Sequence, residues 1–291
     1  MNVDPLDISG LGEHTPTRVT ALRHQVDLLN RQLERMLENR LLQERMKQEL
    51  SLAAQVQGFL IPDSLPVNEH LSMAAIYVPH HDVGGDYYDV VEMRPRQWLF
   101  CVADVAGKGV SAALLMSHLQ ASVRALVRAY TDMPALLTDI NELLSHATRS
   151  ERFVTLFTGI LDEQTGELQY VCAGHIPALL LRNGQIQSLN RGTTLLGMFQ
   201  PLPFLEVGEC RLCPGDVLLT CTDGVLEGQN QRQEPFGQDR LVNLLKELPE
   251  LSTESVNATV LDRLIAHRGG WNFADDLTVL TIHYLGGVKP G

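Results

Sequence analysis

A long stretch without proline near the N-terminus limits the folds open to this chain. From residue 18 to residue 60 there is no proline, and the only glycine, Gly58, stands near the end. Leu, Gln, Glu and Arg dominate this stretch, and all four are strong helix formers. The sequence therefore predicts one long helix over residues 18–62. Residues 1–17 mix Asp, Gly, Pro and Thr without periodicity, which predicts a mobile tail.

The predicted helix carries two apolar stripes that are joined by a four-residue stutter. The stripes consist of Leu22, Val26, Leu29, Leu33 and Met36, followed by Leu42, Met46, Leu50, Ala53, Val56 and Leu60. A helix of this length has to cover such a stripe, either with a second copy as a coiled coil or with the domain that follows. We favour self-association, and hence a homodimer in which this helix is a regulatory linker.

Beyond Pro62 and Pro66 the pattern changes to short strands separated by turn signals. The predicted strands are 71–78, 87–92, 98–105, 153–161, 168–172, 178–181, 186–189, 206–212, 217–221 and 277–284. Helices are predicted at 111–130, 133–148, 237–246 and 253–265, and Asn183-Gly184 indicates a type I′ hairpin. This grouping predicts an α+β domain at 66–286 with antiparallel sheets and flanking helices, followed by a tail at 287–291.

Composition and charge narrow the functional classes. Hydrophobic residues make up 44% of the chain and charged residues 20%, which is typical of a globular protein. The net charge of −12 disfavours nucleic acid or an anionic membrane as the main partner. No apolar run approaches about 18 residues and the first residues do not resemble a signal peptide, so we expect a cytoplasmic protein without membrane insertion.

The five cysteines are odd in number and lie within apolar, strand-like runs, which predicts reduced, buried thiols. Cys210 and Cys213 form a C-x-x-C pair. A zinc site would need a second pair, and a redox site would need a helix after the first cysteine. Residues 214–216 (PGD) indicate a turn instead, so metal or redox use of this pair is disfavoured.

Four aspartates stand where predicted strands give way to loops: Asp86, Asp104, Asp223 and Asp275. If these carboxylates converge, each pair at about 4 Å repels by roughly 4 kcal/mol at an effective dielectric of 20. Such a cluster has to bind protons or cations. Oxygen ligands without nearby His or Cys pairs select hard divalent ions, which here means Mn²⁺ or Mg²⁺.

The order and neighbours of these aspartates resemble the PPM, or protein phosphatase 2C-like, family, and in particular its bacterial SpoIIE/RsbU-type branch. The resemblance spans residues 48–286. The matching motifs are AQVQ at 54–57 with LIP at 60–62, VGGDYYD at 83–89, ADVAGKG at 103–109, AGHIP at 173–177, TDGVLE at 222–227 and DDLT at 275–278.

The resemblance implies a fold and a metal site. The fold would be a sandwich of two antiparallel β-sheets flanked by helices, with two ions at one end. Asp104 would bridge the ions, the Val105 carbonyl would add a ligand, Asp223 and Asp275 would complete one shell, and Asp86 would serve the second ion. Asp104, Asp223 and Asp275 would be the catalytic residues.

The implied activity is that of a metal-dependent protein serine/threonine phosphatase. A metal-bridging water would attack phosphoserine or phosphothreonine in line, without a phosphoenzyme. In this branch the substrates are phosphorylated STAS-domain anti-anti-sigma factors of bacterial partner-switching pathways. Two alternatives stay open: a catalytically weak scaffold that binds a partner, and a coiled-coil sensor or adaptor.

Several side chains near the motifs have no assigned role at this stage. Eukaryotic relatives have a histidine two residues after the bridging aspartate, but Ala106 stands here, so the general acid is unassigned. His175 is interpreted as a structural hydrogen-bond partner rather than its replacement. Whether Asp276 or Lys108 assists is left open, and the flanking glycines of Lys108 do not form a Walker loop.

Overall fold

The computed structural model describes residues 15–148, 152–248, 252–270 and 273–286. The chain divides after Leu52 into two units, which we describe separately. The first unit is helical and belongs to α1 (Thr15–Gly58), which continues into the second unit. The expected tail at 287–291 and residues 1–14 of the expected N-terminal tail lie outside the described residues.

The predicted long helix is present, although its limits are earlier than the sequence pattern suggested. It ends at Gly58, and a turn at residues 59–60 leads toward Pro62. Glycine is a poor helix former and proline cannot continue the hydrogen-bond ladder, so the two residues together account for this end. Apolar side chains along α1 are exposed; Val26, Leu33, Met36, Leu42 and Met46 are each more than half accessible.

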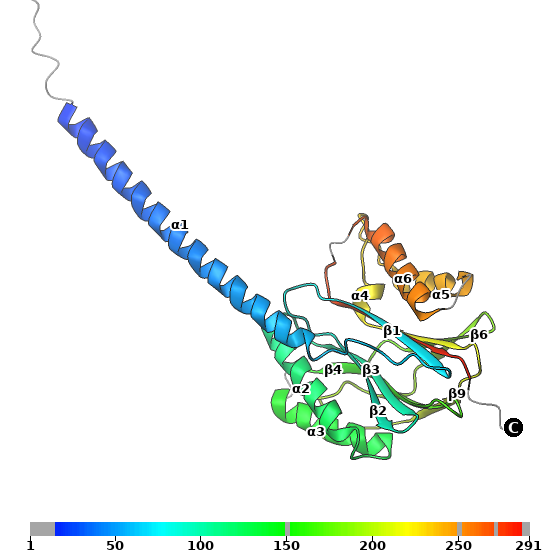
Figure 1. The fold of residues 1–291 in the computed structure, drawn as a ribbon. Helices are drawn as coiled ribbons and strands as arrows, with labels where there is room; N and C mark the ends of the chain where they lie inside the picture. The colour runs from blue at the N-terminus through cyan, green and yellow to red at the C-terminus, as the bar shows by residue number, and fades with distance from the viewer. Residues whose placement is uncertain (1–14, 149–151, 249–251, 271–272, 287–291) are drawn as a thin grey trace, which may run out of the picture. The chain divides into compact units, whose positions relative to one another are not determined.

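The second unit is built around two β-sheets (Figure 1). The five-stranded sheet has the order β1 (Leu71–Val78), β11 (Leu277–Tyr284), β10 (Val217–Cys221), β6 (Ala178–Arg182) and β7 (Gln185–Leu189). The six-stranded sheet has the order β2 (Tyr87–Arg94), β3 (Gln97–Val105), β4 (Val154–Asp162), β5 (Glu167–Ala173) and β8 (Gly192–Thr193), with β9 (Gly208–Arg211) also paired to β5.

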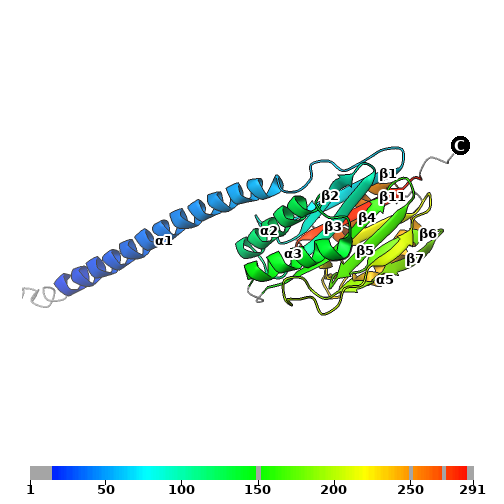
Figure 2. The same ribbon diagram turned by 90° about the horizontal axis from the view of Figure 1, so that it is seen from below.

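Helices cover the outer faces of both sheets (Figures 1 and 2). Over the six-stranded sheet lie α2 (Val110–Leu126) and α3 (Met133–Thr148), and over the five-stranded sheet lie α5 (Gly237–Glu247) and α6 (Thr253–Arg268). A four-residue helix, α4 (Asp223–Leu226), follows β10 directly. The second unit is thus a sandwich of two sheets flanked by helices, as the fold class predicted.

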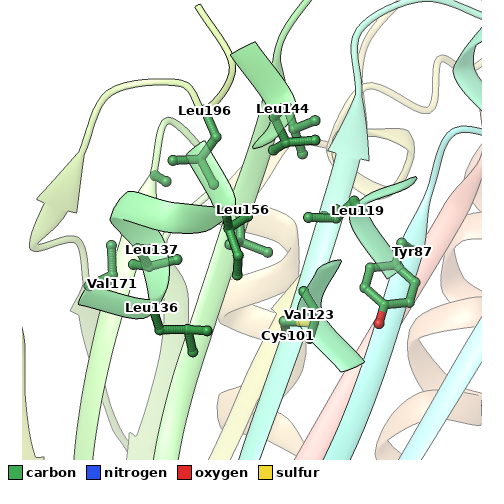
Figure 3. Close-up of a cluster of buried hydrophobic side chains, with 14 of the residues drawn as sticks. Tyr87, Cys101, Leu119, Val123, Leu136, Leu137, Leu144, Leu156, Val171 and Leu196 are labelled. Atoms are coloured by element: carbon green, nitrogen blue, oxygen red, sulfur yellow. The ribbon is translucent and has the colours of Figure 1, made fainter. Parts of the chain in front are cut away.

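Three apolar cores separate these layers, and β3 shows how one strand serves two of them. Phe100 and Val102 face the core between the sheets, whereas Cys101 and Ala103 face the core beneath α2 and α3. Because successive side chains alternate across a strand, a strand covered on both faces is apolar throughout. Figure 3 shows the core beneath α2 and α3, in which side chains from these two helices meet those of the six-stranded sheet.

Most predicted strands and helices are observed, and the differences are local. Asn183 and Gly184 both have positive φ, 50° and 74°, and join β6 to β7, as the hairpin prediction required. The predicted antiparallel pairing holds except between β5 and β8, which pair in parallel. Both β8 and α4 were absent from the prediction, because two and four residues are too short to give a periodic pattern.

The prediction of buried cysteines was correct for three of the five. Cys101, Cys172 and Cys221 are buried, but Cys210 is half-buried and Cys213 is exposed. Cys213 lies at the turn between β9 and β10, where the Asp216 N–H donates to its carbonyl, so it is outside the strand core. All five are free thiols. Among the described residues, no helix has the length and apolar character needed to cross a membrane.

Candidate metal centre

The four predicted aspartates come from both sheets and lie at one end of the sandwich. Asp86 immediately precedes β2, and Asp104 is the penultimate residue of β3. Asp223 opens α4 after β10, and Asp275 stands two residues before β11. Each carboxylate is therefore fixed by a strand end, and the two sheets together bring them into electrostatic contact.

Asp86 is the most buried carboxylate of the group, with 1% of its surface exposed. The hydroxyls of Thr222 and Thr278 both donate to its Oδ2, each at 2.7 Å, and so tie it to the opposite sheet. Burial, followed by the nearby Asp104 charge, raises the pKa of Asp86 well above its usual range. Among the described side chains none donates to its Oδ1, which leaves that oxygen for a cation.

Asp104 has the strongest concentration of acidic neighbours. Burial, followed by repulsion from Asp223, Asp275 and Asp276, raises its pKa to about 7, while Lys108 acts in the opposite direction. A carboxylate in this position is poorly stabilised by the protein alone. A bound cation would reverse the balance, because it favours the charged form.

The Val105 carbonyl lies beside the loop that carries Asp86. A β-carbon at Gly85 would come within 3.1 Å of the Val105 oxygen and 3.2 Å of the Ala112 β-carbon. The absence of a side chain at Gly85 therefore lets the Asp86 loop approach β3 closely. This close approach brings the loop of Asp86 next to the backbone that follows Asp104.

Burial, followed by the charges of Glu227 and Asp275, raises the pKa of Asp223. The glycine that follows it is required by packing, since a β-carbon at Gly224 would lie 1.9 Å from the carbonyl oxygen of Asp276. The Asp-Gly pair is thus more than a turn signal. It lets α4 begin directly against the segment that leads into β11.

Lys108 supplies the compensating positive charge at the mouth of the cluster. Its Nζ lies 2.8 Å from Oδ2 of Asp275 and donates to the carbonyl oxygen of Ala274 at 3.0 Å. The bond to Asp275 raises the pKa of Lys108 above its usual value. Lys108 and Asp275 are both partly exposed, so an incoming anion can reach them.

Asp276, whose role the sequence left open, organises the loop before Asp86. Its Oδ1 accepts from the His80 N–H and its Oδ2 from the Gly85 N–H, both at 2.7 Å. The hydrogen bonds hold residues 80–85 against the start of β11. The sequence showed only that residues 275 and 276 are adjacent acids. That pattern does not tell whether Asp276 binds a metal ion or holds the loop through hydrogen bonds.

Among the described histidines, His80, His81 and His175 lie near the motifs, and none has a ring hydrogen bond to the acidic cluster. His175 is buried, its Nδ1 lies 2.8 Å from the Thr155 hydroxyl, and burial lowers its pKa to about 4. Thr155 pairs with Asp104 across β3 and β4, so His175 is a neutral hydrogen-bonding residue behind the site. The rings of His80 and His81 contact each other, with centroids 4.1 Å apart and their planes tilted by 46°.

Gln57 was not singled out by the sequence reasoning, although it lies in the AQVQ motif. It is buried in the last turn of α1, where its side-chain amide pairs with the backbone of Gly84. Gln57 is buried while the neighbouring Gln55 and Val56 are exposed. The sequence alone does not distinguish Gln57 from these neighbours, so its contact could be found only in the structure.

The donor set fits divalent cations, although the ligands do not form a closed cage. Among the described residues no three His, Cys, Asp or Glu side chains are already positioned to hold one metal ion. However, the cluster consists of oxygen donors, two of its carboxylates are strongly raised in pKa, and a lysine partly neutralises a third. Hard cations such as Mn²⁺ and Mg²⁺ match these ligands.

A hollow of about 420 Å³ opens beside the cluster. It is lined by Lys108, Gly224, Glu227, Arg268 and Asp275, among others. A positive and a negative group thus face the same space. Glu227, which also raises the pKa of Asp223, was not recognised from the sequence as part of this wall.

The fold places this domain in a known structural class. The PP2C domain of SiaA from Pseudomonas aeruginosa superposes with a TM-score of 0.74 at 22% identity, covering 83% of this chain and 98% of that one. The catalytic domain of the serine/threonine protein phosphatase PstP, solved with two manganese ions, superposes with a TM-score of 0.55 at 16% identity, covering 74% of this chain and 99% of that one. The fold is therefore that of the PP2C-type protein phosphatases.

Sequence comparison then gives the family within this class. The family model described as stage II sporulation protein E (SpoIIE) matches residues 94–285, and the chain belongs to this family. The protein IcfG of a Synechocystis strain is 26% identical, over 81% of this chain and 41% of IcfG. The phosphoserine phosphatase RsbU of Bacillus subtilis is 26% identical, over 83% of this chain and 71% of RsbU. The chain thus spans less than half the length of IcfG.

Proposed function

We propose that this chain is a metal-dependent protein serine/threonine phosphatase that uses two Mn²⁺ or Mg²⁺ ions. The observation that supports this most strongly is the position of Asp104, whose pKa is raised to about 7 among three further aspartates. Asp104 would bridge the two ions, the Val105 carbonyl would add a ligand, and Asp223 and Asp275 would complete the shell of one ion. Asp86 and Asp104 would hold the other.

The bound ions would activate water as the nucleophile and neutralise charge on the phosphoryl oxygens. The protein's own groups prepare the site. The hydroxyls of Thr222 and Thr278 donate to Oδ2 of Asp86 and so fix this carboxylate. Its other oxygen, Oδ1, takes no part in these two hydrogen bonds. Asp276 holds the loop that precedes Asp86. Lys108, partly exposed beside Asp275, is placed to contact a phosphoryl oxygen when substrate enters the hollow.

The substrate class we propose is a phosphoserine or phosphothreonine on a regulatory protein, and specifically on a STAS-domain anti-anti-sigma factor. The similarity to RsbU, whose name is phosphoserine phosphatase, supports the phosphoserine part. Membership of the SpoIIE family supports a regulatory substrate. The proposal of a STAS-domain substrate in particular is based on the resemblance of the sequence motifs to the SpoIIE/RsbU-type branch.

We further propose that residues 18–62 form a regulatory linker through which two chains pair, and that residues 66–286 form the catalytic domain. The support for pairing is the exposure of apolar residues along α1, including Leu29, Leu33 and Met36. A long helix that exposes such side chains gains by burying them in a coiled coil.

Phosphate release from a purified, phosphorylated STAS-domain protein tests the proposal. The chain should be inactive after dialysis against a chelator and should regain activity with Mn²⁺ or Mg²⁺. A phosphotyrosine peptide serves as the control, and phosphate should be released from it much more slowly. Full activity in excess chelator would exclude the metal mechanism, and stoichiometric binding of the STAS protein without any phosphate release would favour the scaffold alternative.

A further inference from the structure

Three adjoining hollows lead from the acidic cluster along α5 and α6. The first is the 420 Å³ hollow that contains Lys108 and Asp275. A second, of about 260 Å³, shares Asn230 and Arg268 with it. A third, of about 450 Å³, shares Ala266 and His267 with the second. Shared walls make them one continuous surface, which we call the α5/α6 track.

The outer part of this track is basic, in contrast to the chain as a whole. Its two outer hollows are lined by four arginines, Arg232, Arg240, Arg263 and Arg268, and by two glutamates. The whole chain carries a net charge of −12. An excess of arginine on an acidic protein creates a local positive potential that attracts acidic partners and repels basic ones.

The lining also has the chemistry to hold a peptide rather than a bare ion. The third hollow is lined by Phe236 and Leu244, which are largely buried core residues, next to Arg240 and Arg263. Arg263 is exposed, and its planar guanidinium can bind a carboxylate through two hydrogen bonds. Protein interfaces commonly combine an apolar centre with a polar rim, and here the charge of the rim favours an acidic partner.

We propose that the α5/α6 track binds an acidic segment of the substrate protein close to its phosphorylated residue. The proposal rests on the phosphatase function argued above, because the track begins at the hollow where the phosphoryl group would enter. The phosphoserine would lie beside Lys108, and acidic residues of the same chain would lie against Arg240 and Arg263. The track would thereby select substrates by their flanking charge.

The test compares two phosphoserine peptides that differ only in their flanks, one with glutamates on both sides and one with asparagines. Wild-type protein in saturating Mn²⁺ should show a lower KM for the acidic peptide. Arg263→Glu should raise that KM about three- to tenfold with kcat unchanged, as expected for reversing one exposed charge. It should leave the neutral peptide and p-nitrophenyl phosphate unaffected.

Arg128→Glu is the matched control, since Arg128 is exposed in the turn that follows α2 and lines none of the three hollows. It should change neither peptide's KM. Raising the salt concentration to about 0.5 M should remove the preference of the wild type, because screening weakens exposed pairs. Equal KM values for the two peptides, or equal effects of Arg263→Glu on both, would overturn the track.

Peptide binding measured by fluorescence anisotropy separates this proposal from the catalytic one. If the wild type binds the acidic peptide in an Arg263-dependent manner but releases no phosphate, the phosphatase function fails and the track stands. If both peptides are hydrolysed equally, the track fails and the function stands. Displacement of the acidic peptide by an oligonucleotide of equal charge, at equal concentration, would overturn the peptide assignment in favour of general polyanion binding.

Discussion

The side-chain amide of Gln57 forms two hydrogen bonds with the backbone of Gly84. Its Nε2 donates to the Gly84 carbonyl oxygen at 2.7 Å, and its Oε1 accepts from the Gly84 N–H at 3.0 Å. The next two residues are Gly85 and Asp86. The N–H of Gly85 donates a hydrogen bond to the Asp276 carboxylate. The end of α1 is thus connected through one buried pair to the loop that places a proposed metal ligand.

We expect Gln57→Leu to lower phosphatase activity several-fold and to raise the Mn²⁺ concentration needed for half-maximal activity. The substitution leaves the buried N–H and C=O of Gly84 without partners, at a cost of about 1–3 kcal/mol each. That cost would displace the Asp86 loop. Thermal melting and manganese titrations of phosphate release measure the two effects.

Gln55→Leu is the control for this substitution, because Gln55 is exposed two residues earlier in the same helix. It should leave both the melting temperature and the manganese titration nearly unchanged. Equal behaviour of the two variants would show that the Gln57–Gly84 pair does not set the geometry of the loop.

The second expectation concerns the regulatory role proposed for α1. Removal of residues 1–47 should abolish self-association and change turnover several-fold, because most of the exposed apolar stripe is lost. Polar substitutions at Ala53 and Val56, or at Leu60 beyond the helix end, should still alter activity in the shortened protein. Sedimentation and phosphate release should be measured on the same samples. Unchanged mass together with unchanged turnover would leave the helix a passive tether.

The third expectation is a pH dependence of metal-free stability. The pKa of Asp104 is raised from its ordinary value of 3.8 to about 7, so the folded protein binds this proton more tightly than the unfolded chain. Between about pH 4 and pH 7 stability should therefore fall as the pH rises, and this group should add no further change well above pH 7. The melting temperature of chelator-treated protein should be lower at pH 8 than at pH 6.

Saturating Mn²⁺ should weaken or reverse this trend. Cations bind the deprotonated carboxylates, so their stabilising effect grows as the pH rises through the same range. For the same reason, higher Mn²⁺ should move the acid limb of activity to lower pH. A melting profile identical with and without manganese at every pH would argue that the cluster does not bind it.

Much of this fold follows from local pattern, and the limits of prediction follow from the same cause. The continuous apolar run in β3 and the Asn183-Gly184 turn are local signals, and both were interpreted correctly. The parallel contact between β5 and β8 depends on chain segments about twenty residues apart in sequence. No periodicity reports such a pairing.

The candidate site divides in the same way. Asp86, Asp104, Asp223 and Asp275 were selected because they stand where predicted strands give way to loops, and the structure brings them to one end of the sandwich. Gln57 and Asp276 act through backbone groups distant in sequence. Hydrogen bonds of this kind leave no residue-type pattern, so both contacts were visible only in the folded chain.

The fourth expectation tests the central claim, that Asp104 holds divalent ions for phosphoester hydrolysis. Phosphate release from a phosphoserine peptide should be measured for wild type and Asp104→Asn across a manganese titration. The variant should lose at least about a hundredfold in turnover, the scale on which loss of a transition-state charge stabiliser acts. Its metal-free melting temperature at pH 8 should equal or exceed that of wild type, because a repelled charge is removed.

The two readouts together decide the matter. If Asp104 holds the ions, Asp104→Asn loses activity without losing stability, and the wild type depends on added manganese. An Asp104→Asn protein that keeps most of its activity at saturating manganese would contradict the account.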